Sequence, residues 1–206
     1  DIRDHIFQIL EKEGIDYERE AVEIIARRAE GGMRDALSIL DQALSLTQEA
    51  TLTTAVSEEI TGTISLSALD NYVAALAQKD VPGALENLDL IFENGKSMTR
   101  FVVDLLQYLR DILIVQAGGE NTHYSEAFKS NLKLPQDVLF EMISLATRSL
   151  SDIKSSLQPK IYAEMMTIRL AEINSQPELS GEVAEELSSL REEVARLKQA
   201  LANVGS

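Results

Sequence analysis

Residues 31–42 read GGMRDALSILDQ, two glycines followed by a run whose apolar residues recur at helical spacing. The glycines free the backbone for a sharp turn, and a helix is predicted from Met33 to about Leu46. Arg34 falls in the first turn of that helix. A cation is unfavourable there, because the partial positive charge of a helix N-terminus favours anions. Arg34 therefore either holds an external anion, such as a phosphate, or pairs with Glu30 or another surface carboxylate.

The residues on either side of this stretch also predict helices. A first helix has one apolar face, made of Ile2, Ile6, Ile9 and Leu10. Gly14 suits the end of that helix, and Asp16 is placed to cap a second. A short fourth helix is expected from about Thr53 to Ile60. Four helices of this length predict a small bundle over residues 1–62.

Longer helices follow Gly62, and we expect a second helical domain over residues 63–175. Residues suited to helix starts recur along it: Ser65, Asp80, Ser97, Pro135 and Pro159. Phe92 is expected to point into the core. The last helix of this domain is expected to bear four apolar residues: Ile161, Met165, Ile168 and Leu170. No stretch alternates apolar and polar residues over the length of a β-strand, so the fold class is predicted to be all-α.

Pro177 separates a last segment, residues 176–206, in which a charged helix is expected from about Gly181 to Asn203. Its apolar residues are spaced alternately by four and three: Val183, Leu187, Leu190, Val194, Leu197, Leu201 and Val204. This spacing is an a/d heptad seam over three heptads. Self-association through Leu187, Leu190, Val194, Leu197 and Leu201 is one interpretation. The other is an amphipathic helix that lies free or folds back on the preceding domain.

The charges beside this seam suit a parallel pair. With Leu187 at an a position, Glu186 and Glu193 fall at g. In a parallel partner they would face Arg191 and Lys198 at e.

Composition narrows the possible partners. The formal net charge is −15, from 34 Asp and Glu against 19 Lys and Arg. That charge repels a phosphate backbone, so little direct DNA binding is expected, and proteins are the expected partners. No apolar run approaches the roughly 20 residues of a membrane span, and no signal peptide is apparent. Because the chain opens with Asp1 and a helix begins at once, we expect a piece of a longer protein.

No catalytic constellation is visible in the sequence. Cysteine is absent, which excludes disulfides and thiolate metal sites and is compatible with a reducing cytoplasm. His5 and His123 are the only histidines and lie in unrelated segments, so each is expected to be an ordinary surface or capping residue. No Gly-rich phosphate loop of the P-loop pattern occurs. We therefore expect no enzyme activity and no metal site in this chain.

The stretch GGMRDALSILDQ resembles the sensor-2 motif of the gamma/tau subunits of bacterial DNA polymerase III, which are AAA+ clamp-loader ATPases. The preceding IFQILEKEGIDYEREAVEIIARRAEGG is similar to the helices before sensor 2 in that family. The following LTTAVSEEITGTIS resembles its junction between lid and collar. The resemblance implies an AAA+ lid over residues 1–62, a collar that assembles subunits over residues 63–175, and a cytoplasmic protein of the replication machinery.

The resemblance also implies roles for residues near position 34. Arg34 would be the sensor-2 arginine, placed against the γ-phosphate of ATP that a preceding domain holds with Mg. Met33 and Leu37 would flank the adenine. The phosphate-gripping motifs of the family are not in this sequence, so the chain by itself is expected to bind ATP weakly or not at all.

Partners follow from the same resemblance: other gamma/tau copies and the delta and delta-prime subunits. The sliding β clamp and primer-template DNA would be reached through the whole assembly. Two other hypotheses remain. One is a stand-alone acidic helical adaptor that recruits a protein through its C-terminal coiled coil, and the other is a related AAA+ protein.

Overall fold

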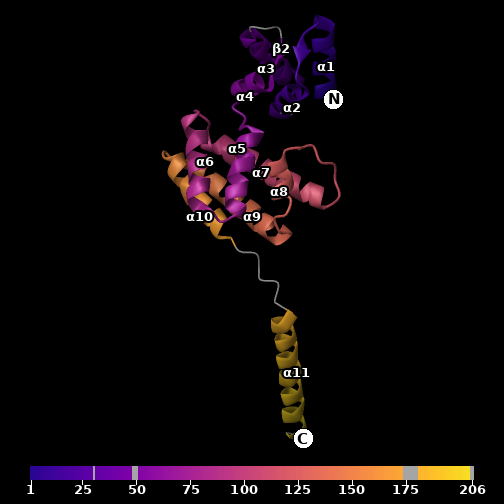
Figure 1. Ribbon diagram of the computed structural model, residues 1–206, viewed down its shortest axis with the longest axis vertical. Helices are drawn as coiled ribbons and strands as arrows, with labels where there is room; N and C mark the ends of the chain where they lie inside the picture. Colours follow the sequence, from indigo (N-terminus) through magenta and orange to yellow (C-terminus); the bar gives the residue numbers. More distant parts are fainter. Residues whose placement is uncertain (30, 48–50, 174–180, 205–206) are drawn as a thin grey trace. The chain divides into compact units, whose positions relative to one another are not determined.

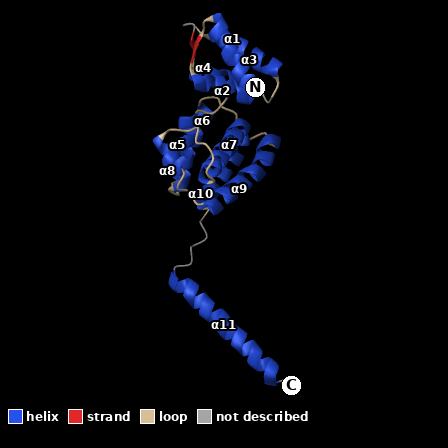
Figure 2. Cartoon of the chain, turned by 90° about the vertical axis from the view of Figure 1, so that its right-hand side faces the viewer, coloured by secondary structure: helices blue, strands red, loops and turns tan. Residues whose placement is uncertain are grey.

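The computed structural model describes residues 1–29, 31–47, 51–173 and 181–204, with the side chains of 181–185, 187 and 201–204 outside the description. Within these ranges the regular secondary structure is helical apart from two strands of two residues each (Figure 2). The predicted all-α class is confirmed. The chain divides into two compact units, Asp1–Ile173 and Asn174–Ser206. The first unit has two separate clusters of buried apolar side chains.

The N-terminal bundle contains the first of these clusters. Its elements are α1 (Ile2–Glu13), β1 (Asp16–Tyr17), α2 (Arg19–Arg28), α3 (Met33–Leu46), β2 (Thr51–Leu52) and α4 (Thr54–Thr61) (Figure 1). Ile6, Leu10 and Ile25 are fully buried between the helices. Gly14 ends α1 in the left-handed conformation, with φ 68°, as the sequence predicted.

Asp16 does not cap the second helix, so that prediction is wrong. It lies in β1, where it pairs in parallel with Thr51 of β2. The helix begins three residues later and has Glu18 as its N-cap residue. The Glu18 side chain makes no cap but accepts a hydrogen bond from the backbone N–H of Thr54, at 2.7 Å. The strand partner of Asp16, Thr51, is distant in sequence, so a local capping rule cannot reveal this pairing.

The central bundle contains the second cluster. It is made of α5 (Leu66–Ala77), α6 (Val81–Glu93), α7 (Met98–Gln116), α8 (Glu126–Asn131), α9 (Gln136–Ser155) and α10 (Pro159–Glu172) (Figure 1). The predicted caps are confirmed, because Ser65, Asp80 and Ser97 each accept a hydrogen bond from a backbone N–H of the first turn. The core is centred on α7, of which Phe101, Leu105, Leu109 and Ile112 are fully buried.

A polar cluster is buried inside this bundle. Asp70 of α5, only 4% exposed, accepts hydrogen bonds from the Tyr108 hydroxyl of α7 at 2.6 Å and from Ser125 Oγ at 2.7 Å. The Asn131 amide of α8 donates to the Tyr108 hydroxyl at 2.9 Å. The Phe128 ring stands edge-on to the Tyr108 ring, with centroids 5.3 Å apart. This cluster positions the short helix α8 against α5 and α7.

Of the four apolar residues expected on α10, only Leu170 is buried. Ile161, Met165 and Ile168 are 49%, 45% and 38% exposed. The buried positions of α10 are Ala163, Met166, Thr167, Leu170 and Ala171. Apolar residues occur on more than one face of this helix, so periodicity alone did not select the face that packs on α9, α6 and α5.

Two further contacts explain which face of α10 is buried and why Phe92 is exposed. Thr167 Oγ1 lies 2.7 Å from the hydroxyl of the buried Tyr72, which fixes Thr167 inside the bundle. On the outside, Lys160 Nζ lies 2.8 Å from Asp89 and 5.0 Å from the centre of the Phe92 ring. Phe92, 44% exposed, therefore lies under a lysine at the surface and not in the core, contrary to the prediction.

The second unit contains α11 (Gly181–Val204), which is continuous over the predicted heptads. Leu190, Val194 and Leu197 are exposed, and the side chains of Leu187 and Leu201 lie outside the described residues. In the part of the chain that the structure describes, no helix combines the length and the apolar character needed to cross a membrane.

Candidate functional site

The site is the N-terminus of α3, which follows a turn at the two glycines. Gly31 has φ 89°, a left-handed conformation that side-chain-bearing residues rarely adopt. The N–H of Gly32 donates to the carbonyl of Ala29 at 2.8 Å, just after α2. A Cβ at Gly32 would lie 3.1 Å from Asp35 Oδ2, so a larger residue there would press on the first turn of α3. The glycine pair thus lets α3 begin close to the end of α2.

Among the residues that the structure describes, no side chain caps this helix. Gly32 is the N-cap residue of α3 and has no oxygen with which to accept a hydrogen bond from the first turn. The N-caps of α4, α5, α6 and α7 use a side-chain oxygen for that purpose, whereas those of α2, α9 and α10, like that of α3, do not. The N-terminus of the 14-residue α3 therefore keeps backbone donors and positive potential that an external anion can use.

The three residues predicted for the site lie together in the first turn and a half of α3. Arg34 is exposed, Met33 is half-buried, and Leu37 is 37% exposed. Arg34 and Leu37 are three residues apart and so share a face of the helix. Ala36, Leu40 and Ala43 are buried on the opposite side and hold α3 in the N-terminal bundle. The core thus fixes the direction in which Arg34 points away from the bundle.

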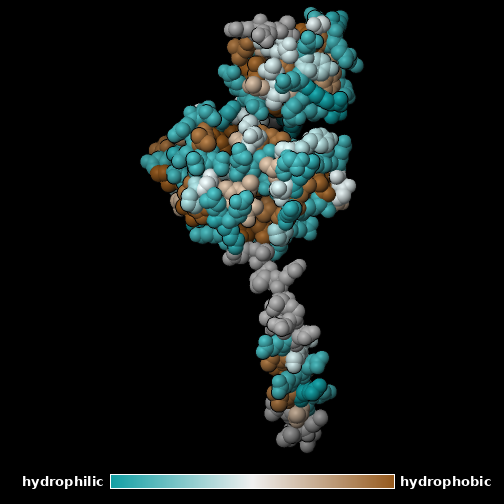
Figure 3. Space-filling model, viewed as in Figure 1, coloured by the Kyte–Doolittle hydropathy of each residue, from teal (hydrophilic) through white to brown (hydrophobic). Residues whose placement is uncertain are grey.

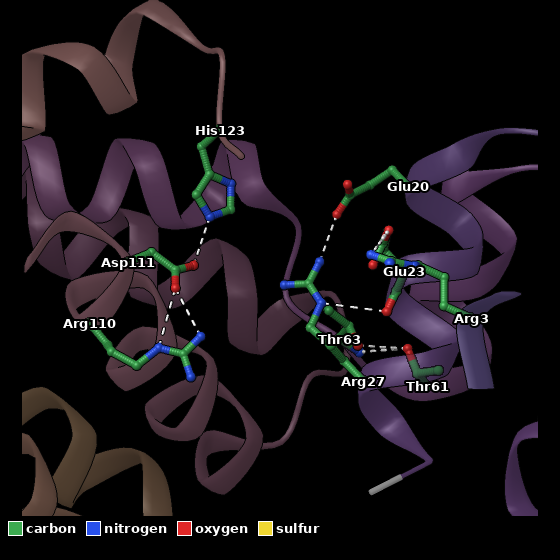
Figure 4. Close-up of polar contacts among 9 residues, drawn as sticks. All are labelled: Arg3, Glu20, Glu23, Arg27, Thr61, Thr63, Arg110, Asp111 and His123. Carbon is green, nitrogen blue, oxygen red and sulfur yellow. Dashed lines mark hydrogen bonds and ion pairs between the residues drawn. The ribbon is translucent and has the colours of Figure 1, made fainter. Parts of the chain in front are cut away.

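Arg34 differs in its electrostatic surroundings from two arginines of the neighbouring helices, Arg27 and Arg3. Arg27 of α2 lies 2.9 Å from Glu20, and Arg3 of α1 lies 3.3 Å from Glu23 (Figure 4). Among the described residues, no carboxylate lies within 4.0 Å of the Arg34 guanidinium. Glu30, the alternative partner, lies outside the described residues. The described residues thus leave Arg34 available for an anion presented from outside.

The connection between the two bundles is held by a buried carboxylate that the sequence did not single out. Asp104 of α7, 5% exposed, accepts a hydrogen bond from the backbone N–H of Ile64 at 2.9 Å. Arg100, one turn earlier, donates from Nε to the other Asp104 oxygen at 2.8 Å. Next to it, the hydroxyls of Thr61 and Thr63 lie 2.7 Å apart (Figure 4). The only hint of this contact in the sequence was an aspartate inside an apolar helical run. Its backbone partner is 40 residues away, so the contact itself was not predictable.

His123 is not the ordinary surface or capping residue that the sequence suggested. It is 8% exposed, and its Nε2 lies 2.8 Å from Asp111 Oδ2 of α7 (Figure 4). Arg110 donates to the other Asp111 oxygen. In the described ranges, no group of three residues is arranged to hold a metal ion. This histidine ties the loop after α7 to the helix and forms no metal site.

The Asp111 interactions predict a pH dependence of stability. Burial acts to raise the pKa of Asp111, but the hydrogen bonds from His123 and Arg110 outweigh it and hold the pKa below its ordinary value of 3.8. A depressed folded-state pKa stabilises the fold above the unfolded-state pKa, and this contribution is lost as the pH falls through the folded-state value. Between about pH 4 and pH 2, the free energy of unfolding should thus fall more steeply in the unmodified chain than in Asp111→Asn. Urea unfolding at a series of pH values measures both curves. Parallel curves in this range would contradict the assignment.

Comparisons with known proteins cover most of the chain. A model of the DNA polymerase III clamp loader subunit ATPase lid domain matches residues 1–49, and a model of DNA polymerase III subunits gamma and tau domain III matches residues 52–185. DNA polymerase III subunit tau of Bacillus subtilis is 30% identical over 203 residues, which cover 93% of this chain and 36% of that protein. The gamma/tau subunit of Mycobacterium tuberculosis is 24% identical over 178 residues, covering 79% of this chain and 30% of that protein.

A third relative, subunit tau of Escherichia coli, is 31% identical over 115 residues, covering 56% of this chain and 18% of that protein. The chain thus spans about a third of the length of the first two relatives and less of the third. The lid model covers the turn at Gly31 and Gly32 and the whole of α3.

Proposed function

Because the chain belongs to the gamma and tau subunit family of bacterial DNA polymerase III, we propose that it forms the ATP-sensing lid and the assembly collar of a clamp-loader motor subunit. In this proposal residues 1–62 are the lid, residues 63–175 the collar, and residues 176–206 a linker with a heptad helix. The separate hydrophobic clusters of the N-terminal and central bundles support a division between lid and collar.

The observation that carries the lid function is the uncapped N-terminus of α3 with an exposed Arg34 beside it. These two groups can contact only the terminal phosphate of a nucleotide. A preceding domain would hold most of the ATP and the Mg. When bound there, ATP supplies the terminal phosphate charge to which the lid responds. The Arg34 guanidinium would stabilise that charge, and Met33 and Leu37 would lie along the adenine.

The packing of α3 supports a lid that moves as one body. Ala36 and Leu40 are buried in the same cluster as Ile6 and Ile25, so a displacement of Arg34 is passed to the whole bundle. At the other end, Asp104 holds the backbone of Ile64 to the collar. The hinge between the lid and the collar would then lie in residues 61–63, where Gly62 has φ 67°.

The collar is proposed to join further gamma/tau copies and the delta and delta-prime subunits into a ring, which places the β clamp on primed DNA. Its outer surface has the exposed apolar residues that such contacts need, among them Ile161, Met165 and Ile168 of α10. A stand-alone adaptor is less well supported, because the lid match includes the turn and helix around Arg34, for which an adaptor has no use.

Gel filtration of this chain mixed with delta and delta-prime tests the collar assignment. The expected result is a complex that elutes ahead of each separate protein. A chain with Met165→Asp and Ile168→Asp is the matched variant, and its complex should be at least about tenfold weaker, because two charges would be buried at the interface. A chain with Thr147→Asp and Arg148→Asp on exposed α9 positions is the control. Absence of any complex with the unmodified chain would remove the collar assignment.

A further inference from the structure

The surface of α11 has features that the proposed lid and collar do not use. All its described side chains, residues 186 and 188–200, are exposed. Among them Leu190, Val194 and Leu197 are 53%, 50% and 59% exposed and follow one another at the heptad spacing. Figure 3 shows hydrophobic side chains between hydrophilic ones along this part of the helix. An apolar stripe of this kind at heptad spacing is a surface that a partner helix covers.

We propose that α11 pairs with α11 of a second copy of this chain as a parallel, in-register, two-stranded coiled coil. Leu190 and Leu197 then lie at d positions and Val194 at the a position between them. Val194 is β-branched and lies between leucines at d, a combination that favours two strands over three or four, whereas the a positions on either side of it are leucines. The same seam extends in sequence through Leu187 and Leu201, whose side chains lie outside the described residues.

Charge selects the second copy as the occupant, and it selects the parallel direction. In a parallel pair, each g residue faces the e residue of the next heptad in the partner, so Glu186 faces Arg191 and Glu193 faces Lys198. All four of these side chains are exposed and available. In an antiparallel pair, g faces g and e faces e, which would oppose glutamate to glutamate and cation to cation.

The remaining charges of the helix lie away from the seam. Arg196 and Glu192, at c and f positions, are 4.0 Å apart on the same helix and 81% and 70% exposed. They stabilise α11 itself and leave the g and e residues for the partner. The pair of helices would join two motor subunits independently of any contact between collars.

Cysteine cross-linking tests the register, because the natural sequence contains no cysteine. Chains with Leu190→Cys are expected to form a disulfide-linked dimer under mild oxidation, since equal d positions of a parallel pair come within disulfide range. Glu192→Cys, two residues away on the outer side, is the matched control and should cross-link at least about tenfold more slowly. Equal rates for the two variants would overturn the proposal. So would a Leu190→Cys chain that links only to a Leu197→Cys chain, because that result excludes an in-register parallel pair.

A charge exchange tests the identity of the partner. In a Leu190→Cys background, Arg191→Glu with Lys198→Glu places four glutamates along each side of the seam and should abolish cross-linking. Glu186→Lys with Glu193→Lys should do the same through repulsion between cations. An equal mixture of the two variants restores every opposite-charge pair, and it should form mixed dimers at the rate of the parent. Failure of the mixture to cross-link would overturn the proposal even if the lid and collar behave as proposed.

Discussion

Replacement of Arg34 by alanine in the intact motor subunit is expected to lower ATP-dependent clamp placement by about 100-fold. The guanidinium lies exposed at an uncapped helix N-terminus, where it would meet the terminal phosphate of the nucleotide. A group that stabilises charge developing on a phosphate contributes most during the reaction, so the loss should appear in turnover more than in nucleotide affinity. Steady-state ATP hydrolysis measures turnover and apparent nucleotide affinity, and a loading assay on primed DNA measures clamp placement.

Two variants separate this role from a structural one. Arg34→Lys keeps the charge but not the planar fork and should recover part of the activity. Arg148→Ala removes another exposed arginine, on α9, and should leave loading unchanged. The fold of the Arg34→Ala chain should be unaffected, with a change in the free energy of unfolding below about 0.5 kcal/mol, because the side chain is on the surface. Normal clamp placement by Arg34→Ala would end the sensor assignment.

Replacement of Asp70 by alanine is expected to lower the free energy of unfolding of the central bundle by about 3 kcal/mol. The Asp70 side chain accepts hydrogen bonds from Tyr108 and Ser125 at 2.6 and 2.7 Å inside the bundle. Its removal leaves a buried tyrosine hydroxyl short of an acceptor and an N-cap serine of α8 without its partner. The cost of an unmade buried hydrogen bond exceeds the net gain from making one.

Urea unfolding followed by circular dichroism measures this loss, with Asp152→Ala on the exposed face of α9 as the control. The resonances of α8 should also broaden or shift before global unfolding, because Asp70 is one of the residues that hold this short helix in place. If Asp70→Ala and Asp152→Ala unfold at the same urea concentration, the polar cluster contributes nothing to stability.

The start and end of most helices were predictable from local chemistry. Ser65, Asp80 and Ser97 cap helices as expected, and α3 begins at Met33 after the glycine pair, because such signals act within one turn of the chain. The family was also recognisable from the run around Arg34, since its spacing and residue types are local properties. The roles of Arg34, Met33 and Leu37 and the domain boundaries stay predictions.

Long-range partners were not predictable in this way. Asp16 pairs with Thr51 in place of capping α2, His123 is buried against Asp111, and Asp104 holds the backbone of Ile64. Each of these contacts joins residues that are distant in sequence, and a polar residue has several acceptable local uses. Only the packing of the whole bundle decides which use is realised.

The sequence by itself determined most of the helices, the caps at Ser65, Asp80 and Ser97, and the heptad spacing of α11, because backbone geometry and side-chain periodicity are set within a few residues. The tertiary structure decided which face of α10 is buried, since Ile161, Met165 and Ile168 are as apolar as the residues that pack inside. It also left Arg34 without a carboxylate partner among the described residues. The physical reason is that burial and ion pairing are properties of neighbours in space, and these neighbours are set by how the helices pack together.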